Sequence, residues 1–394
     1  MAIPALRLLV AAIILAVAVA WLAFKFGTGL SHLSAPTLSR ISNIDLGLPL
    51  DRLVLSHPPA DPGNAATLSN LKASQASYYA SEVTRDFCAA HGYQVFTPPW
   101  PSGRRKVFDL FMANSELDLI EIRLATLYNH VDYFIIVESS RTFQGRPKPL
   151  TVRDNWPRFR NFHDKIIYHL LEFPPGFAPR LTWDYEDLQR DASLDQVLPR
   201  LTGPQAPVYG DVIVVADVDE IPRPAALLVL RSCVFPRRLT LSSRFYYYSY
   251  QFRHTGADWP HPQATIWQGS DKTIRPTKLR GSDGGSTMSR ILESGRLENA
   301  GWHCSSCFST IGEFLNKMAS FSHMWMNEPK YRDVHRIAAA VRDGRDVWGR
   351  RQDVFERIDD NDDVPPPLLT ESGRRRFGYM LSRDGESAGF SDYP

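Results

Sequence analysis

From residue 106 onward, the chain alternates short apolar runs with segments of helical periodicity. The apolar runs have the length and composition of strands that are buried on both faces. They occupy residues 106–112, 131–139, 164–173 and 211–218. Between them, residues 117–127 and 183–198 repeat apolar residues at the spacing of a helix. Strands that alternate with helices predict an α/β fold, with a mostly parallel sheet flanked by helices on both faces.

Two local patterns refine this expectation. Ser115, with Asp118 three residues later, has the spacing of a capping box, so we expect a helix to begin there. Residues 244–253, with the sequence RFYYYSYQFR, are rich in the aromatic residues that strands favour. We expect them to form one core strand with tyrosine hydroxyls at its rim, and stacking of these rings on a sugar is the alternative.

The N-terminus carries a different pattern. Residues 8–24 are all apolar and lie between Arg7 and Lys25. As a helix this run is roughly 25 Å long, close to a hydrocarbon core of about 30 Å, so we expect one signal-anchor helix. A cleaved signal peptide is the alternative, because the small residues at 16–20 resemble a cleavage site. Both alternatives send the rest of the chain into the secretory pathway.

Composition divides the chain into four parts. Residues 1–25 contain a cytosolic tip and the membrane helix, and residues 26–104, rich in Ser, Ala and Pro, are expected to form a stem. Within the stem, residues 76–92 have helical spacing and are expected to dock on the domain that follows. Residues 105–382 form that domain, and residues 383–394 form a tail.

The bulk composition excludes some classes of function. Of the 394 residues, 43% are hydrophobic and 22% are charged, as in ordinary globular proteins. A net charge of +2 without a basic tract argues against a nucleic-acid partner. Cysteines can be bridged in an oxidising lumen, and we expect Cys304 and Cys307 to be structural, as a local disulfide. A zinc site would need a second close pair, and Cys88 and Cys233 are far apart in sequence.

The candidate chemistry lies in the sequence VIVVADVDEIPRP. Asp217, Asp219 and Glu220 directly follow a buried strand. Ligands of parallel sheets bind beyond the carboxyl ends of strands, and carboxylates on one side of the backbone suit Mg²⁺ or Mn²⁺. The structural alternative is a turn, in which one of these carboxylates accepts hydrogen bonds from backbone N–H groups before Pro222. An EF-hand is excluded, because Pro222 occupies its glycine position.

Three classes of protein fit this motif. A phosphohydrolase of the haloacid-dehalogenase type also places D-x-D after an apolar strand, but normally on the first strand of its domain. Three predicted strands precede the motif here. A nucleotide-sugar transferase of the GT-A type places D-x-D in the middle of its domain, which fits this order of elements. A non-catalytic, membrane-anchored glycan-binding protein is the third class.

Three stretches together resemble one known family. They are residues 108–150, 216–224 (ADVDEIPRP) and 301–308 (GWHCSSCF), and the likeness extends from about residue 105 to about residue 382. They resemble glycosyltransferase family 17, whose best-known activity adds bisecting N-acetylglucosamine (GlcNAc) to N-glycans.

This resemblance implies a fold, a reaction and a location. The fold is the Rossmann-like GT-A sheet, and the reaction transfers GlcNAc from UDP-GlcNAc with inversion and a Mn²⁺ or Mg²⁺ ion. The acceptor is a glycan or glycoprotein, with the β-linked mannose of an N-glycan core as one candidate. The location is the Golgi membrane, as a single-pass type II protein with a lumenal catalytic domain.

The resemblance also suggests metal ligands. Asp219 is expected to hold the ion, with Asp217 assisting it or reaching the ribose of the donor. His323 is expected to be a further ligand, and its structural alternative is packing in an aromatic patch. His303 is the rival ligand, because it lies inside the third motif.

Glu313 is the candidate general base for the acceptor hydroxyl. Residues 301–325 predict a loop and then a helix capped by Ser309 or Thr310, with Glu313 in the first turn. GT-A enzymes often take their base from such a helix. The structural alternative is an acidic residue favoured by the positive end of the helix dipole.

The remaining candidates concern the donor and the acceptor. Glu138 ends the second predicted strand, and Arg141 and Lys148 follow it, so these three are expected to bind the nucleotide, with a solvated loop as the alternative. Trp259 and Trp267 are candidates for contacts with the acceptor. Two charged pairs are expected to be structural instead: Glu121 with Arg123, and Glu186 with Arg190.

Overall fold

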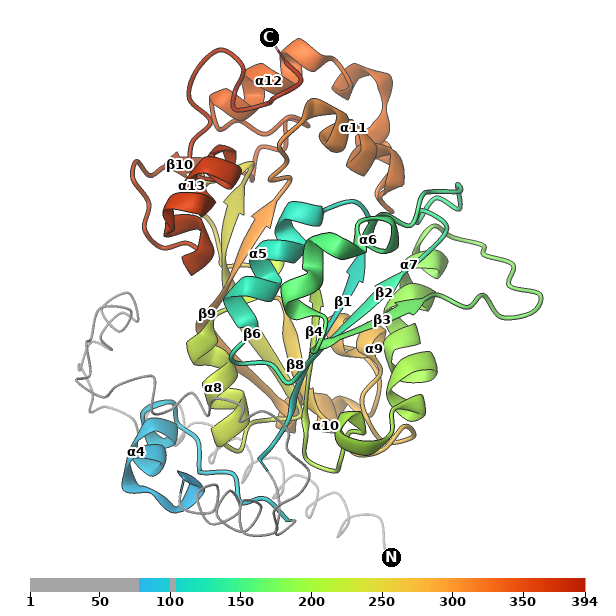
Figure 1. Ribbon diagram of the computed structural model, residues 1–394, viewed down its shortest axis with the longest axis vertical. Helices are drawn as coiled ribbons and strands as arrows, with labels where there is room; N and C mark the ends of the chain where they lie inside the picture. Colours follow the sequence, from blue (N-terminus) through green and yellow to red (C-terminus); the bar gives the residue numbers. More distant parts are fainter. Residues whose placement is uncertain (1–77, 100–103, 394) are drawn as a thin grey trace, which may run out of the picture. The chain divides into compact units, whose positions relative to one another are not determined.

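The computed structural model describes residues 78–99 and 104–393. The four expected strands form a continuous parallel group in the order β3–β2–β1–β4, which confirms the prediction of a parallel core (Figure 1). Their bounds are β1 Val107–Ala113, β2 Tyr133–Glu138, β3 Ile166–Leu170 and β4 Val212–Asp217.

The sheet continues beyond β4 with mixed strand directions. β8 (Gln263–Ile266) runs antiparallel to β4, and β6 (Arg238–Tyr247) runs antiparallel to β8. β7 (Ser249–His254) and β10 (Phe355–Arg357) extend the sheet further. The long β9 (Ser294–Ser305) lies parallel to β6 and antiparallel to the short β5 (Glu220–Pro222). The sheet therefore has a parallel half and a second half in which antiparallel pairs predominate.

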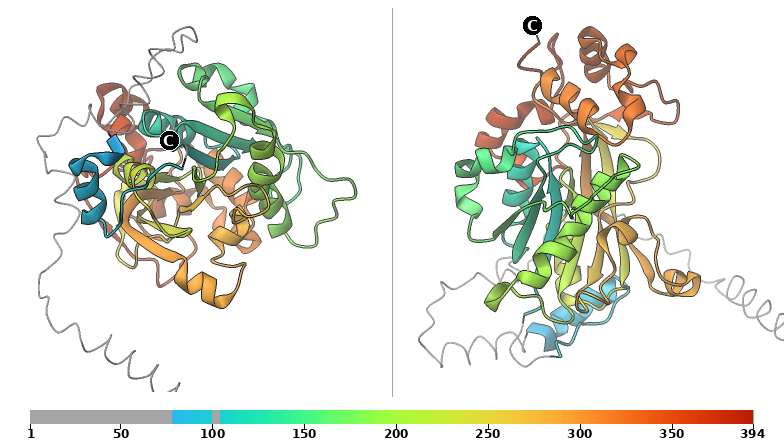
Figure 2. Two further views of the ribbon diagram at one scale, coloured as in Figure 1. Left: turned by 90° about the horizontal axis from the view of Figure 1, so that it is seen from below. Right: turned by 90° about the vertical axis from the view of Figure 1, so that its right-hand side faces the viewer.

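Helices cover both faces of the parallel half, as the alternation of elements predicts (Figure 2). Odd-numbered side chains of β1, such as Phe111, pack with α5 (Leu117–Leu127) and α8 (Pro224–Ser232). Even-numbered ones, such as Phe108, face the elements that follow β3 in the chain. These are α7 (Trp183–Ala192), the π-helical turn Ser193–Val197 and α9 (Pro276–Arg280). Two short helices complete this region: α6 (Thr151–Asp154) and α10 (Thr287–Leu292).

Two local predictions are wrong. Ser115 does not cap α5, since Glu116 holds the N-cap position without a side-chain hydrogen bond to the helix. Residues 244–253 are not one strand but a tight hairpin, because Tyr248 adopts a left-handed backbone with φ of 66° and reverses the chain between β6 and β7. The guanidinium of Arg383 donates to the Tyr248 carbonyl at 2.6 and 2.9 Å and holds this turn. Tyr248 and Tyr250 are buried, as expected for core residues.

The segment from residue 311 to 393 contains α11 (Ile311–Ser320), α12 (Val334–Arg342) and α13 (Glu371–Phe377). α11 and α12 lie beyond the carboxyl ends of the parallel strands (Figure 1). Residues 383–393 belong to the same packing, because Phe390 is buried and Asp392 accepts hydrogen bonds from the first backbone N–H groups of α11.

The segment before the sheet is tied to the domain. α4 (Glu82–Ala90) carries Cys88, which forms a disulfide with Cys233 at the end of α8. The expected local disulfide between Cys304 and Cys307 is also present. The predicted membrane helix at residues 8–24 lies outside the described residues, and none of the helices described is long and apolar enough to cross a bilayer.

The Cys88–Cys233 disulfide should contribute much of the stability of this domain, because it closes a loop across 145 residues of sequence. Replacing both cysteines by alanine is expected to lower the free energy of unfolding by roughly 2–4 kcal/mol in chemical denaturation. The Cys304→Ala/Cys307→Ala double variant is the control, and its loss should be smaller because that loop is short. Equal losses in the two double variants would contradict this expectation.

Candidate functional site

A cleft of about 270 Å³ lies beyond the carboxyl ends of β1 and β4. Its walls come from segments that are far apart in the sequence, including the ends of these strands, the Asp217–Asp219 turn, β6, β9, α11 and the segment after α12. The three metal ligands expected from the sequence, Asp217, Asp219 and His323, all line it. The position agrees with the rule that ligands of parallel sheets bind at the carboxyl ends of strands.

A buried arginine holds the turn that carries the motif. Arg123 on α5 forms an ion pair with Asp109 of β1, with a shortest distance of 2.6 Å, and both side chains are almost fully buried. Its Nη1 also donates to the carbonyl oxygens of Asp217 and Glu220, at 3.2 and 2.6 Å. The expected pairing of Arg123 with Glu121 is therefore wrong, because Glu121 binds Arg158 and Arg376 on the surface instead.

Two arginines neutralise Asp217 and Glu220. Arg280 of α9 donates to one oxygen of Asp217 at 2.8 Å and to both oxygens of Glu220 at 2.6 and 2.9 Å. Arg190 of α7 donates to the other oxygen of Asp217 at 2.7 Å, and it also keeps the expected helix pair with Glu186. Burial alone would raise the pKa values of the two acids, but the arginine charges outweigh it and lower both. Both carboxylates are therefore ionised.

Glu220 has a structural role within the turn of the motif. Its side chain is fully buried, and it accepts hydrogen bonds from the backbone N–H of Asp217 and from the indole of Trp259, both at 2.8 Å. It thus fixes the turn of the motif to the loop that carries Trp259. Asp217, whose side chain remains 34% exposed, is left at the surface of the cleft.

Asp219 has different neighbours. Its Oδ2 accepts a hydrogen bond from Lys317 of α11 at 3.1 Å, and its Oδ1 lies 3.7 Å from Nδ1 of His303. The His303 ring stacks on Trp259 at a centroid distance of 4.6 Å and on Phe245 at 5.0 Å. Burial lowers the pKa of Lys317, but the charge of Asp219 more than offsets this and raises it. Lys317 is therefore a stable cation beside Asp219.

The Asp219–His303 pair fits a divalent cation. Nδ1 of His303 is buried and finds no hydrogen-bond partner among the described residues, so its lone pair or proton is unused. Within residues 78–99 and 104–393, no group of three or more His, Cys, Asp or Glu side chains is arranged to hold a metal ion. Two protein ligands suffice for Mg²⁺ when substrate phosphates supply the others.

His323 does not join this pair. Its ring packs against Trp183 at 5.1 Å and against Phe321 at 4.9 Å, which is the aromatic packing that was its structural alternative. Burial lowers the pKa of His323, so the ring is neutral at neutral pH.

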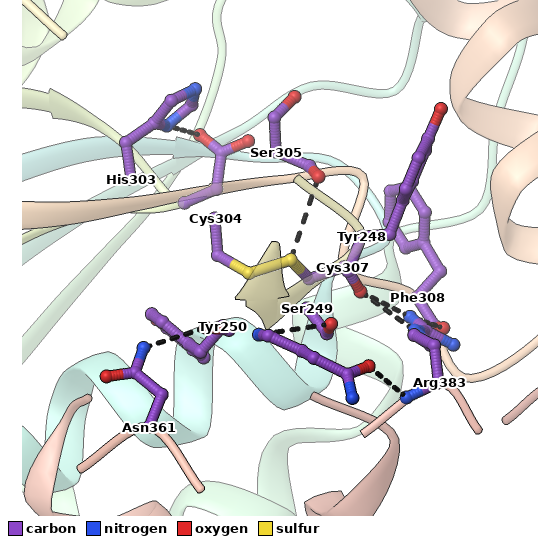
Figure 3. Close-up of a disulfide and its surroundings, with 12 residues drawn as sticks. Tyr248, Ser249, Tyr250, His303, Cys304, Ser305, Cys307, Phe308, Asn361 and Arg383 are labelled. Atoms are coloured by element: carbon purple, nitrogen blue, oxygen red, sulfur yellow. Dashed lines mark hydrogen bonds and ion pairs between the residues drawn. A yellow bond between two sulfur atoms is a disulfide. The ribbon is translucent and has the colours of Figure 1, made fainter. Parts of the chain in front are cut away.

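His303 directly precedes the Cys304–Cys307 disulfide, which constrains the end of β9 (Figure 3).

Glu313 is reassigned from general base to helix cap. Its Oε2 accepts hydrogen bonds from the backbone N–H groups and the hydroxyls of Ser309 and Thr310, at 2.9–3.2 Å. Thr310 is the N-cap of α11, as the sequence suggested, and forms a complete capping box with Glu313. A carboxylate with four such donors is already satisfied, and Glu313 is not among the described residues that line the cleft.

The three expected donor contacts also have other roles. Glu138 is fully buried and accepts hydrogen bonds from the backbone N–H of Val152 at 2.9 Å and from a tyrosine hydroxyl, so it fixes the start of α6. Lys148 lies 3.6 Å from Glu138 as its counter-ion, and Arg141 donates to a carbonyl of its own loop. In the described part of the chain, these three residues lie outside the lining of the cleft.

The cleft also has an aromatic wall. Trp259, one of the two acceptor candidates, lines it together with Phe245, Tyr247 and Trp348. Trp267 does not, because it is buried in the core between the sheet and α7. Aromatic walls with a few fixed polar groups are typical of sites for small ligands.

Several site residues were missed at the level of sequence. They are Lys317, Arg280, Arg123, Trp348 and Asp353. The three cations bind carboxylate or carbonyl oxygens of a turn that is far from them in the sequence, and Trp348 and Asp353 line the cleft beside residues that are equally distant in the sequence. Arg280 stands 60 residues from Glu220, and Lys317 stands 98 residues from Asp219. No local spacing marks such partners, although three clustered carboxylates do signal that cations must be near.

The buried ion pair gives a stability prediction. Arg123→Met leaves the buried Asp109 unpaired and is expected to cost about 3–5 kcal/mol in free energy of unfolding, measured by urea denaturation. Arg158→Met is the matched control, because it breaks partly exposed ion pairs with Asp118 and Glu121 of α5 and should cost about 1 kcal/mol or less. Similar losses for the two variants would show that Arg123 does not anchor the turn.

Comparison with known proteins places these features in a family. Residues 69–356 match the sequence model of Glycosyltransferase family 17. The β-1,4-mannosyl-glycoprotein 4-β-N-acetylglucosaminyltransferase of Homo sapiens is 25% identical over 308 residues, covering 70% of this chain and 55% of its own length. The Rattus norvegicus protein of the same name is 25% identical over 308 residues, covering 70% of this chain and 54% of its own.

The chain spans about half the length of the curated relatives it matches. Among solved structures, the mannosyltransferase PcManGT from Pyrobaculum calidifontis, in complex with GDP-Man and Mn²⁺, aligns over 79% of this chain and 81% of its own. The identity is 11% and the TM-score is 0.31. The sequence match of residues 69–356 confirms the resemblance seen in the three motifs: the chain belongs to glycosyltransferase family 17.

Proposed function

We propose that this protein is a metal-dependent, inverting glycosyltransferase that moves GlcNAc from UDP-GlcNAc to a glycan acceptor. One observation carries the proposal. In a chain of family 17, Asp219 and the unbonded Nδ1 of His303 lie 3.7 Å apart in a cleft at the carboxyl ends of the parallel strands. The names of the relatives support the choice of GlcNAc as the transferred sugar.

The residues around the cleft have complementary roles in this reaction. Asp219 and His303 would hold a Mn²⁺ or Mg²⁺ ion, and such an ion would supply Lewis-acid stabilisation for the departing diphosphate. Lys317 adds a second positive charge beside the same group, since its Nζ lies at the cleft and its cationic form is favoured. Asp217, fixed by Arg190 and Arg280, presents ionised oxygens that can accept hydrogen bonds from the ribose hydroxyls.

The proposal includes a lumenal location. Cys88–Cys233 and Cys304–Cys307 pair all four cysteines of the chain, and such disulfides persist in oxidising compartments. This supports passage through the secretory pathway, with residues 8–24 as the anchor and the Golgi membrane as the destination. The two other classes, a phosphohydrolase and a non-catalytic glycan-binding protein, are separated from the proposal by the reaction products.

The first test replaces the carboxylate that holds the ion. Asp219→Asn is expected to lower the rate of transfer from UDP-GlcNAc, with Mn²⁺ present, by roughly 100-fold or more, because one ionic ligand is lost. Release of UDP and formation of a glycosylated acceptor are the readouts. Asp164→Asn, an exposed carboxylate before β3, is the control and should keep wild-type activity.

Two results would refute the function. An Asp219→Asn variant with full transferase activity would remove the assigned role of this carboxylate. A wild-type protein that releases inorganic phosphate from phosphomonoesters, and transfers no sugar, would identify the phosphohydrolase.

The second test separates the two candidate histidines. His303→Ala is expected to weaken Mn²⁺ binding to the UDP-bound protein by at least about tenfold in calorimetric titration, because a direct ligand is lost. His323→Ala, which removes a ring from the same cleft, should change Mn²⁺ affinity by less. The opposite order of the two effects would make His323 the ligand.

A further inference from the structure

The part of the cleft formed after α12 has no role in the proposed binding of the donor. Trp348, Arg350 and Asp353 come from this segment and line the cleft together with Phe245 and Tyr247 of β6. Asp353 lies close to the strands, because β10, which pairs with β7, begins only two residues later. A carboxylate, a guanidinium and aromatic rings are thus held together beside the donor half of the site.

Among the described residues that line the cleft, the carboxylates other than Asp353 already have binding partners or an assigned role. Asp217 binds two arginines, and Asp219 binds Lys317. Glu186 binds Arg190 and accepts a hydrogen bond from a serine hydroxyl at 2.6 Å. Glu116 accepts a hydrogen bond from the backbone N–H of Ser115 beside its own helix. These four acids are committed to donor binding or to structure.

The contacts of Asp353 leave one oxygen available. Its Oδ2 forms an ion pair with Nη1 of Arg350 at 2.9 Å. Its Oδ1 lies 3.6 Å from Nε2 of His254, beyond a normal hydrogen bond. Both ring nitrogens of His254 are buried and find no hydrogen-bond partner in the described residues. The Asp353 side chain is 14% exposed, so it is fixed but reachable from the cleft.

The structure also connects Asp353 to the proposed metal ligands. The His254 ring contacts Phe245 at a centroid distance of 5.1 Å, and Phe245 stacks on His303. A row of three rings, His254, Phe245 and His303, therefore connects Asp353 to Asp219. A diphosphate held at Asp219 would leave the space beside Asp353 for a second substrate.

We propose that Asp353 is the general base for the acceptor, in a subsite where Trp348 contacts the sugar that is glycosylated. This inference rests on the proposed transferase function and names the residues that serve its second substrate. The ligand class is a glycan that presents a free sugar hydroxyl. Arg350 fixes the orientation of the carboxylate, and the rings of the subsite cover the apolar face of the sugar.

The reaction balances with these groups. The oxygen of the acceptor hydroxyl forms the new bond to the anomeric carbon, and its proton moves to Oδ1 of Asp353. The bond between the anomeric carbon and the β-phosphate oxygen breaks, and its electron pair leaves with UDP. Attack from the side opposite to the diphosphate gives inversion. Asp353 then releases its proton to solvent, and no further reactant is required.

The test compares donor binding with transfer in the full-length protein. Asp353→Asn keeps the size of the side chain but cannot take up a proton. It is expected to bind UDP-GlcNAc with Mn²⁺ within about twofold of the wild type, and to lower kcat for transfer by roughly 10²–10⁴-fold. Asp359→Asn is the matched control, because Asp359 lies on the same segment, is 71% exposed and pairs only with Arg357 among the described residues.

A second variant tests the subsite without changing the base. Trp348→Ala is expected to raise the KM for the acceptor by roughly tenfold, the scale of one aromatic contact, while the Kd for UDP-GlcNAc stays unchanged. A structural role alone would lower both affinities together. This variant keeps the inference testable even if Asp353→Asn does not fold.

The outcomes separate the two proposals. If the wild type neither binds nor turns over UDP-GlcNAc, the proposed function fails and the acceptor subsite fails with it. If the wild type is active and Asp353→Asn transfers at the wild-type rate, the base assignment alone is wrong. If Trp348→Ala leaves the acceptor KM unchanged, the acceptor does not occupy this subsite.

Discussion

Charge compensation around one turn determines the rest of this site. The chain places Asp217, Asp219 and Glu220 within four residues at the end of a buried strand. Such carboxylates repel one another and are costly to bury, so cations must accompany them. Arg280 and Arg190 meet this requirement for Asp217 and Glu220. Among the described residues, the Asp219 carboxylate has only Lys317 and the unbonded Nδ1 of His303 beside it, which makes it the proposed place for a further cation.

The same compensation links the elements of the fold. Arg190 comes from α7, Arg280 from α9, Lys317 from α11 and Arg123 from α5. Each lies on a helix that packs against the sheet or beyond its strand ends, and each reaches the turn between β4 and β5. The motif is therefore an anchoring point for four helices, and the candidate site and the packing of the domain share one set of ion pairs and hydrogen bonds.

Much of the fold could be predicted from the sequence, because burial on both faces leaves a plain record in apolar runs. The four parallel strands and the position of the D-x-D turn follow from that record. The hairpin at Tyr248 could not be predicted, since its left-handed residue is a tyrosine within an aromatic run and is held by the distant Arg383. The long-range disulfide between Cys88 and Cys233 left no local signal either.

The site was predictable to the extent that its residues are adjacent in sequence. The motif and the His303 segment could be found, but roles that depend on hydrogen-bond saturation could not. Glu313 has the position of a general base in the sequence, yet four short-range donors satisfy its carboxylate. Asp353 has no motif at all, and only the packing of β10 against β7 brings it to the cleft.

A crystal structure of the protein with UDP and Mn²⁺ tests the central claim most directly. The account predicts one metal ion bound to an Asp219 oxygen and to Nδ1 of His303, each at about 2 Å, with the diphosphate completing the coordination next to Lys317. A metal ion bound by other side chains, with His303 still stacked between Phe245 and Trp259 and without a metal contact, would contradict it.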